Sequence, residues 1–280
     1  MAFPTKQALE SITDPYFRSF DMRFADYWRF KEWEREFDDY AKRDKFPSLE
    51  LLRLPHDHFG LFKEAQDGVN TVETQIADND YAIGMVAEKI AHSKYAGSTL
   101  IFIIEDDAQN GPDHVDAHRS IAYVIGPYVK HGAVVSEHYT TVSVLRTIEE
   151  VLGIRALGLY DALQPPMTDV FSEKQAEWSY TARVPAVLRT TKLPLPPKKA
   201  GAKAASSGAQ HDAEYWAAKT RGFDFSVEDK LDSESFNRVL WEGLKGAEQP
   251  YPEGPSGDDL RKNRRELLRS VKPGLSPTSP

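Results

Sequence analysis

The chain has 280 residues, 40% of them hydrophobic, which is enough for a sizeable core in one large domain or in a domain with an appendage. Its 35 basic and 43 acidic residues give a formal charge of −8 without a basic cluster, which argues against nucleic acid as the main partner because phosphate backbones are bound by clustered Lys and Arg. The absence of cysteine excludes disulfides, thiolate metal ligands and cysteine nucleophiles.

The sequence carries no sign of membrane insertion or export. No window approaches the roughly 20 consecutive apolar residues that a membrane-spanning helix needs. The first residues, "MAFPTKQALESITDPYF", have no apolar core of the kind that a signal peptide uses. We therefore expect no membrane span and no signal peptide in this chain, and the compartment stays open.

The first half of the chain alternates helical and strand-like patterns. Aromatic residues between positions 24 and 43 are spaced as in an amphipathic helix. The short apolar run "SLELLRL" (48–54) is bracketed by prolines and predicts a buried strand that leads into "HDH" at 56–58. Thr71 then predicts the start of a helix that ends near His92.

Two apolar runs and a helix follow. "STLIFII" (98–104) and "IAYVIGPYV" (121–129) are continuously apolar, which is typical of strands covered on both faces of a parallel sheet. A helix begins at Thr140 or Thr141 and ends at Gly153. This order of elements predicts an α/β fold with a mostly parallel sheet.

The composition changes after this region. We expect an α/β domain over 1–192 and a flexible linker over 193–210, where the sequence is rich in Pro and then in Ala, Gly and Ser. Residues 211–270 predict a helical extension that packs on the domain. The last segment, 271–280, is expected to be a disordered tail.

Acidic and histidine residues gather at the ends of two predicted strands. Asp57 and His58 follow the first strand, and Asp106 and Asp107 follow the second. Ligands of a parallel sheet collect at the carboxyl ends of its strands, so these side chains are expected to converge. Converging carboxylates repel each other unless a cation lies between them, which predicts a divalent metal. Oxygen and nitrogen ligands suit Zn, Mn, Fe, Mg and Ca alike, so its identity stays open.

Two common metal-binding motifs fit the acidic region poorly. A calcium loop of the EF-hand type fails, because Ala108 and Ala117 stand where its third and twelfth positions need ligands. His114 and His118 have the i, i+4 spacing of helical zinc ligands. However, Pro112 and the strand that follows leave little room for that helix.

Several stretches together resemble a known family. They include "LLRLPHDH", "LIFIIEDDAQNGPDHVDAHRSIAYVIGPYVKHGAVVSEHYTT" and "FNRVLWEGL". Over about residues 10–245 the chain resembles the C-terminal half of bacterial phosphoesterases of the alkaline phosphatase superfamily, which are often found behind β-propeller domains. The resemblance implies an alkaline phosphatase-like, mostly parallel sheet flanked by helices, with a C-terminal helical extension.

The resemblance also implies an activity and a site. It predicts two divalent metal ions, with Zn or Mn favoured, and hydrolysis of a phosphate ester on a small molecule or lipid. Asp106 and Asp107 correspond to ligands of one metal, and Asp57, His58 and His118 to ligands of the other. His114 and His138 are candidates for the phosphate pocket. The family usually has a histidine four residues after Asp57; because Leu61 stands there, His58 takes that role.

One departure concerns the start of the family pattern, where a strand with an acidic ligand and a Ser or Thr nucleophile precedes "TDPYF". We therefore expect a chain that lacks the N-terminal part of the fold and the nucleophile, and a separately supplied N-terminal half is a candidate partner. Family members are usually exported. The alternatives are a non-catalytic fragment or degenerate enzyme that binds metal or phosphate, and an interaction domain whose acidic rim only provides solvation.

Overall fold

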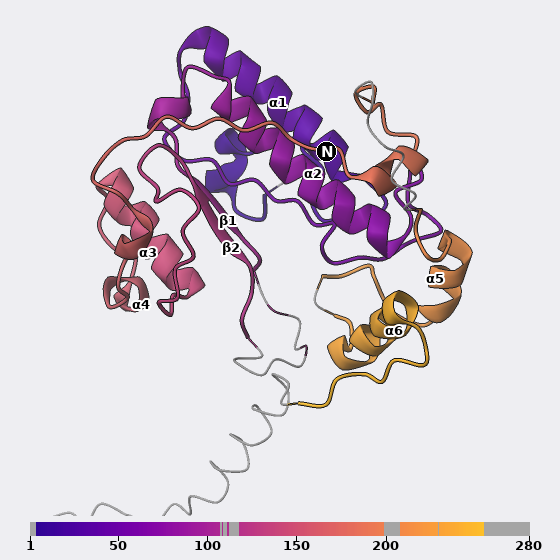
Figure 1. Cartoon of the computed structure of the whole chain (residues 1–280). Coiled ribbons are helices and arrows are strands. Elements are labelled where there is room, and N and C mark those ends of the chain that lie inside the picture. Colours follow the sequence, from indigo (N-terminus) through magenta and orange to yellow (C-terminus); the bar gives the residue numbers. More distant parts are fainter. Residues whose placement is uncertain are drawn as a thin grey trace, which may run out of the picture. The chain divides into compact units, whose positions relative to one another are not determined.

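The computed structural model describes residues 4–106, 108, 111, 118–198, 208–228 and 230–254 (Figure 1). The chain divides into two compact units. Unit 1 comprises Met1–Ile103 and Tyr123–Leu231, and unit 2 comprises Ile104–Ala122 and Asp232–Pro280. Each unit is described on its own below.

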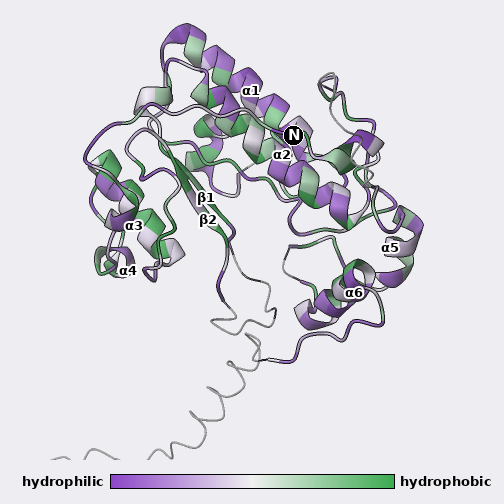
Figure 2. Ribbon diagram, viewed as in Figure 1, coloured by the Kyte–Doolittle hydropathy of each residue, from purple (hydrophilic) through white to green (hydrophobic). Residues whose placement is uncertain are grey.

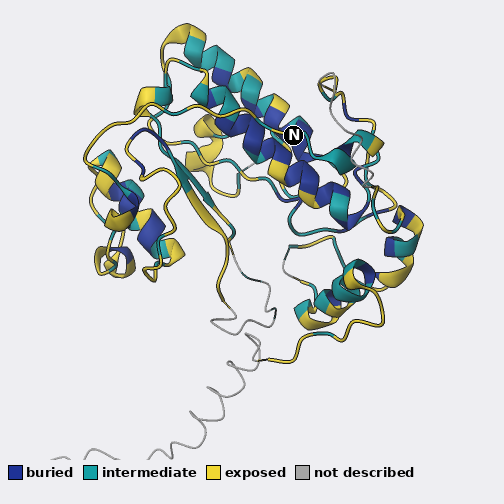
Figure 3. Cartoon of the chain, in the orientation of Figure 1, coloured by how far each residue is buried: buried dark blue, intermediate teal, exposed yellow. Residues whose placement is uncertain are grey.

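Two long helices, α1 (Asp26–Arg43) and α2 (Val72–Ala91), form the core of unit 1 (Figure 1). Both helices were predicted from the sequence, and the structure confirms them. The aromatic face of α1 is buried, and most of α2 is buried or partly buried (Figure 3). Figure 2 shows that polar residues occupy the rest of α1, as expected for an amphipathic helix. The buried apolar residues of the pair include Tyr27, Phe30, Trp33, Phe37, Ala77, Tyr81, Ala82, Met85, Val86 and Ile90.

The helix ends follow local sequence signals. Thr71 caps α2 with a reciprocal pair of hydrogen bonds to Thr74, and Thr140 caps α3 (Thr141–Leu152) in the same way with Ser143. Helix α3 ends at Gly153, whose φ of 66° is the left-handed conformation that glycine adopts without strain. The prediction of both helices and of their caps is confirmed.

The predicted parallel sheet is wrong. Among the described residues the strands are β1 (Ile101–Ile104) and β2 (Ala122–Ile125), which form a two-stranded antiparallel sheet. The backbone N–H of Glu105 donates to the carbonyl of Ile121, so the chain returns directly alongside β1. A parallel pair would need a crossover, usually a helix, between its strands. The described chain is therefore mainly helical, and the alkaline phosphatase-like sheet is not found in it.

The run 48–54 is also not a strand. Leu49 and Leu51 are 48% and 89% exposed, while Leu52 and Leu54 pack against the core of unit 1 as part of a loop. An apolar run forms a strand only where a partner strand is available for its backbone, and this segment pairs with no described strand. Leu52 and Leu54 of the run instead make individual apolar contacts with the core of unit 1.

Shorter elements complete the described chain. They are 3-10 turns at Gln7–Ile12, Ala96–Ser98, Thr168–Val170 and Ala186–Thr190, and helices α4 (Leu159–Ala162), α5 (Ala213–Lys219) and α6 (Ser233–Lys245). Helix α5 lies in unit 1, where Trp216 is fully buried and its ring centroid lies 5.8 Å from that of Phe62. No helix among the described residues is both long and apolar enough to cross a membrane.

The predicted linker and tail are only partly described. Leu193, at the start of the linker 193–210, is buried in the core of unit 1, so the core extends into that segment. Residues 199–207 of the linker and the whole predicted tail lie outside the described residues.

Candidate functional site

The structure places the predicted site residues in different parts of the chain. Asp57 and His58 are partly buried in a loop of unit 1, and His138 is exposed in the loop before α3 of the same unit. Asp106 and His118 are exposed in unit 2. Asp107 and His114 lie outside the described residues. The convergence of all these side chains on metal ions therefore stays a prediction, and the loop that carries Asp57 and His58 is the part that the structure defines.

The residue before this pair, His56, is fully buried. Its Nδ1 lies 2.8 Å from Oδ2 of Asp78, and its Nε2 lies 3.2 Å from the backbone carbonyl of Met22. The backbone N–H of His56 donates to Oδ2 of Asp26 at 3.1 Å. Both ring nitrogens and the main chain of His56 are thus held by hydrogen bonds.

The partners of His56 determine its protonation state. A backbone carbonyl can only accept, so Nε2 carries a proton. Asp78 Oδ2 also accepts the backbone N–H of Asp26 at 2.6 Å, as an ionised carboxylate does, so Nδ1 carries a proton as well. Burial alone would lower the pKa of His56, but the hydrogen bond to Asp78 and the charge of Asp26 outweigh it, and the pKa is raised. His56 is therefore a buried imidazolium.

Arg29 and Asp26 complete a charge-balanced cluster. Arg29 Nη1 donates to Asp26 Oδ1 at 2.9 Å, and Asn79 Nδ2 donates to Asp26 Oδ2 at 3.0 Å. Burial raises the pKa of Asp26, and the charges of His56 and Arg29 oppose that rise. The described partners of the Asp26 carboxyl are all donors, which is the arrangement that a carboxylate needs. Two carboxylates, one guanidinium and one imidazolium give a net charge of zero. The other donors of the buried Arg29 reach the carbonyls of Arg18, Ser19, Asp21 and Phe24.

The same cluster has the ligand types of a metal site. Asp26, His56 and Asp78 each offer a ligand atom within 4.8 Å of the others. A metal-bound imidazole, however, must present an unprotonated nitrogen, and both nitrogens of His56 face acceptors. Arg29 already supplies the positive charge that two buried carboxylates require. The side chains of the cluster therefore satisfy one another, which favours a structural role.

The far end of the loop is held by a second buried group, Gln75 of α2. The N–H of Gly60 donates to Gln75 Oε1 at 2.9 Å, and Gln75 Nε2 donates to the Gly60 carbonyl at 2.8 Å. Phe59, Gly60 and Leu61 have φ angles of 55°, 142° and 47°, a backbone that residues other than glycine rarely adopt. Asp57 and His58 thus lie on a strained loop that is fixed at both ends.

The surroundings of the pair are mixed in charge. The rings of His58 and Phe20 meet edge to face with centroids 5.3 Å apart, and the guanidinium of Arg53 lies 5.9 Å from the Phe20 centroid. Glu228 forms an ion pair with Arg53, and its Oε1 lies 3.8 Å from His58 Nε2. Cationic and anionic side chains therefore lie next to the loop.

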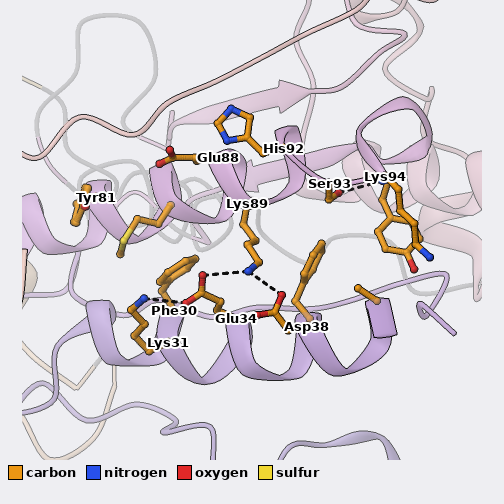
Figure 4. Close-up of a pocket in the computed structure, with 14 residues that line it drawn as sticks. Phe30, Lys31, Glu34, Asp38, Tyr81, Glu88, Lys89, His92, Ser93 and Lys94 are labelled. Atoms are coloured by element: carbon orange, nitrogen blue, oxygen red, sulfur yellow. Dashed lines mark hydrogen bonds and ion pairs between the residues drawn. The ribbon is translucent and has the colours of Figure 1, made fainter. Parts of the chain in front are cut away.

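A groove lies between α1 and α2 and has a volume of about 670 Å³ (Figure 4). Lys89 spans it and forms ion pairs with Glu34 at 3.3 Å and with Asp38 at 2.8 Å. Lys31 pairs with Glu34 from the same helix at 2.9 Å. Because these four side chains form ion pairs with one another, the groove is a weaker candidate for a functional site than the Asp57–His58 loop.

Most residues of the cluster were not predicted from the sequence: Asp26, Arg29 and His56 were missed. Asp78 was expected to serve the first turns of its helix or a neighbouring loop, and it binds the start of α1 and His56. A signal was present in α2. Gln75, Asp78 and Asn79 share a helix face with Ala82, so three polar side chains lie in phase with the apolar stripe. Polar residues on a buried face need partners from elsewhere in the fold, and these partners hold the loop.

No family model matches the sequence, and neither a curated protein nor a solved structure matches it. The likeness to phosphoesterases therefore rests on the motif residues of the chain itself.

Proposed function

We propose that this protein binds a divalent metal ion through Asp57 and His58 and hydrolyses phosphate esters with it. The observation that carries the proposal is the fixed and strained loop. Residues held in sparsely populated backbone conformations cost roughly 1–3 kcal/mol each and cluster at functional sites. Phe59 and Leu61, within three residues of the pair, have positive φ angles. Two buried networks, centred on His56 and Gln75, maintain that conformation.

The donor set supports this chemistry. A carboxylate oxygen and an imidazole nitrogen are ligands that Zn and Mn accept. A metal held there would polarise a phosphoryl oxygen and stabilise the charge that develops during hydrolysis. The assignment of Asp106, Asp107 and His118 as further ligands, and of His114 and His138 to the phosphate pocket, rests on the sequence alone.

The test is metal binding and turnover by the purified full chain. Elemental analysis and titration with Zn and Mn measure metal stoichiometry, and hydrolysis of p-nitrophenyl phosphate measures turnover. We expect Asp57→Asn to remove both. Asp44→Asn is the matched control, because Asp44 is an exposed carboxylate with a φ of 52° at the end of α1, where it pairs with Lys94.

The outcomes separate the two candidate functions. Metal binding that depends on Asp57, without turnover, identifies a non-catalytic metal-binding protein. Equal metal binding by wild type and Asp57→Asn contradicts the proposed site. Circular dichroism of both variants establishes that each is folded.

A further inference from the structure

Beside the Asp57–His58 loop, a carboxylate of the chain itself is bound to a guanidinium. Glu228 is paired with Arg53, and the two side chains are 24% and 49% exposed. The carboxylate also lies 3.8 Å from Nε2 of His58, one of the two proposed metal ligands. An acidic group is thus seated against a guanidinium at the edge of the proposed metal site.

The segment that carries Glu228 packs against the loop through the ring of Phe225. A Cβ atom built on Gly60 would lie 2.4 Å from Cδ1 of Phe225, so the ring packs directly on the glycine. A local turn holds the rest of the segment, in which Ser226 N–H donates to Asp224 Oδ1 at 3.0 Å and Lys230 pairs with Asp224. These contacts place Glu228 at Arg53 without involving Glu228 itself.

A guanidinium that binds a carboxylate can also bind a phosphate, because its planar fork of N–H donors matches the oxygens of either group. A phosphate monoester carries up to two negative charges, whereas a carboxylate carries one. An incoming phosphate would therefore compete with Glu228 for Arg53 and would then lie next to His58.

We propose that Arg53 is the phosphate-binding side chain of this site and that Glu228 is an internal carboxylate that occupies it until a phosphate group displaces it. The proposal deepens the proposed function, because it names the residue that would recognise the anionic part of the ester. In this proposal Arg53 binds the phosphate group of the substrate, and Glu228 competes with that group for Arg53.

The test is the affinity of the full chain for inorganic phosphate, measured by isothermal titration calorimetry in the presence of EDTA. We expect Glu228→Gln to bind phosphate about fivefold more tightly than wild type, as expected when a partly exposed ion pair no longer competes. Arg53→Gln should abolish that gain in the double variant. Arg53→Lys keeps the charge but loses the fork, and should give an intermediate affinity.

The control is Glu150→Gln on α3. It removes the same unit of charge from another exposed ion pair, that with Arg146. If Glu150→Gln tightens phosphate binding as much as Glu228→Gln does, or if the affinity does not depend on Arg53, the proposal is wrong. An unchanged affinity in Glu228→Gln, with a lower free energy of unfolding, would identify a purely structural ion pair and would also overturn it.

This experiment is independent of catalysis, since EDTA removes divalent metals. A gain in phosphate affinity without turnover supports the Arg53 site even if the hydrolase proposal fails. Turnover without any gain in Glu228→Gln refutes the Arg53–Glu228 inference and leaves the hydrolase proposal standing.

Discussion

The buried charge cluster makes a strong prediction about stability. In Asp78→Asn, the cluster keeps the charges of Arg29, His56 and Asp26 and loses one carboxylate, which leaves an uncompensated positive charge in the core. Asp78 also accepts the backbone N–H groups of Asp26 at 2.6 Å and of Tyr27 at 3.0 Å, so it caps the start of α1 from another helix. The substitution therefore disturbs both charge balance and helix capping.

The expected loss follows from these contacts. Removing one partner of a buried ion pair costs about 3–5 kcal/mol, because the remaining charge stays buried without compensation. The Asn side chain keeps one acceptor but places N–H donors where the carboxylate faced two backbone N–H groups and an imidazolium. We therefore expect Asp78→Asn to lower the free energy of unfolding by about 3–5 kcal/mol, a large part of the roughly 5–15 kcal/mol of a typical domain.

Urea denaturation at neutral pH, followed by circular dichroism and tryptophan fluorescence, measures this loss. Asp80→Asn is the matched control, since Asp80 lies two residues further along α2 and is exposed. It should change the free energy of unfolding by no more than about 0.5 kcal/mol. Equal losses in the two variants would refute the buried cluster. In a double-mutant cycle with His56→Gln, the losses should be less than additive, because the second substitution removes the excess positive charge.

Two further predictions concern acid stability and the loop. Burial alone would raise the pKa of Asp21, but hydrogen bonds from Arg23 and a second arginine lower it below 3.8. The ionised Asp21 therefore stabilises the fold above pH 3.8, and this contribution is lost as the pH falls through the folded-state pKa. In Asp21→Asn the free energy of unfolding should fall less between mildly and strongly acidic pH than in the wild type. Urea denaturation midpoints across this pH range measure the difference. Gly60→Ala should cost about 3 kcal/mol in urea unfolding, because its Cβ meets the Phe225 ring. Gly153→Ala, with a left-handed φ but no atom within 4 Å of its Cβ, should cost only about 1 kcal/mol, and equal losses would contradict the loop packing.

The helices of unit 1 were predictable because their signals are local. The aromatic spacing of α1, the cap at Thr71 and the glycine at 153 each act within a few residues of the chain. The same kind of reasoning gave β1 and β2 as strands. It failed for their pairing, because a continuous apolar run does not say which strand lies beside it or in which direction.

The run 48–54 shows why an apolar pattern alone does not establish a strand. Two of its leucines, Leu49 and Leu51, are exposed and the other two are partly buried, and the run pairs with no strand among the described residues. Likewise, the cluster joins Asp26 to Asp78 over a separation of 52 residues, which no local signal encodes. Only the polar residues in the apolar stripe of α2 pointed to such a contact.

The three residues His56, Asp57 and His58 are neighbours in sequence and have different environments in the fold. His56 is fully buried between a carboxylate and a carbonyl, so it is charged and has no lone pair to offer a metal. The side chain of His58 is 13% exposed and lies between an aromatic ring and a carboxylate, so it keeps access to solvent. Within this motif the proposed metal-ligating role therefore falls to Asp57 and His58, while His56 fixes the main chain from which both residues extend. The charge cluster is thus a condition for the proposed site and not a part of its chemistry, because the strained loop would otherwise relax to a conformation without positive φ angles.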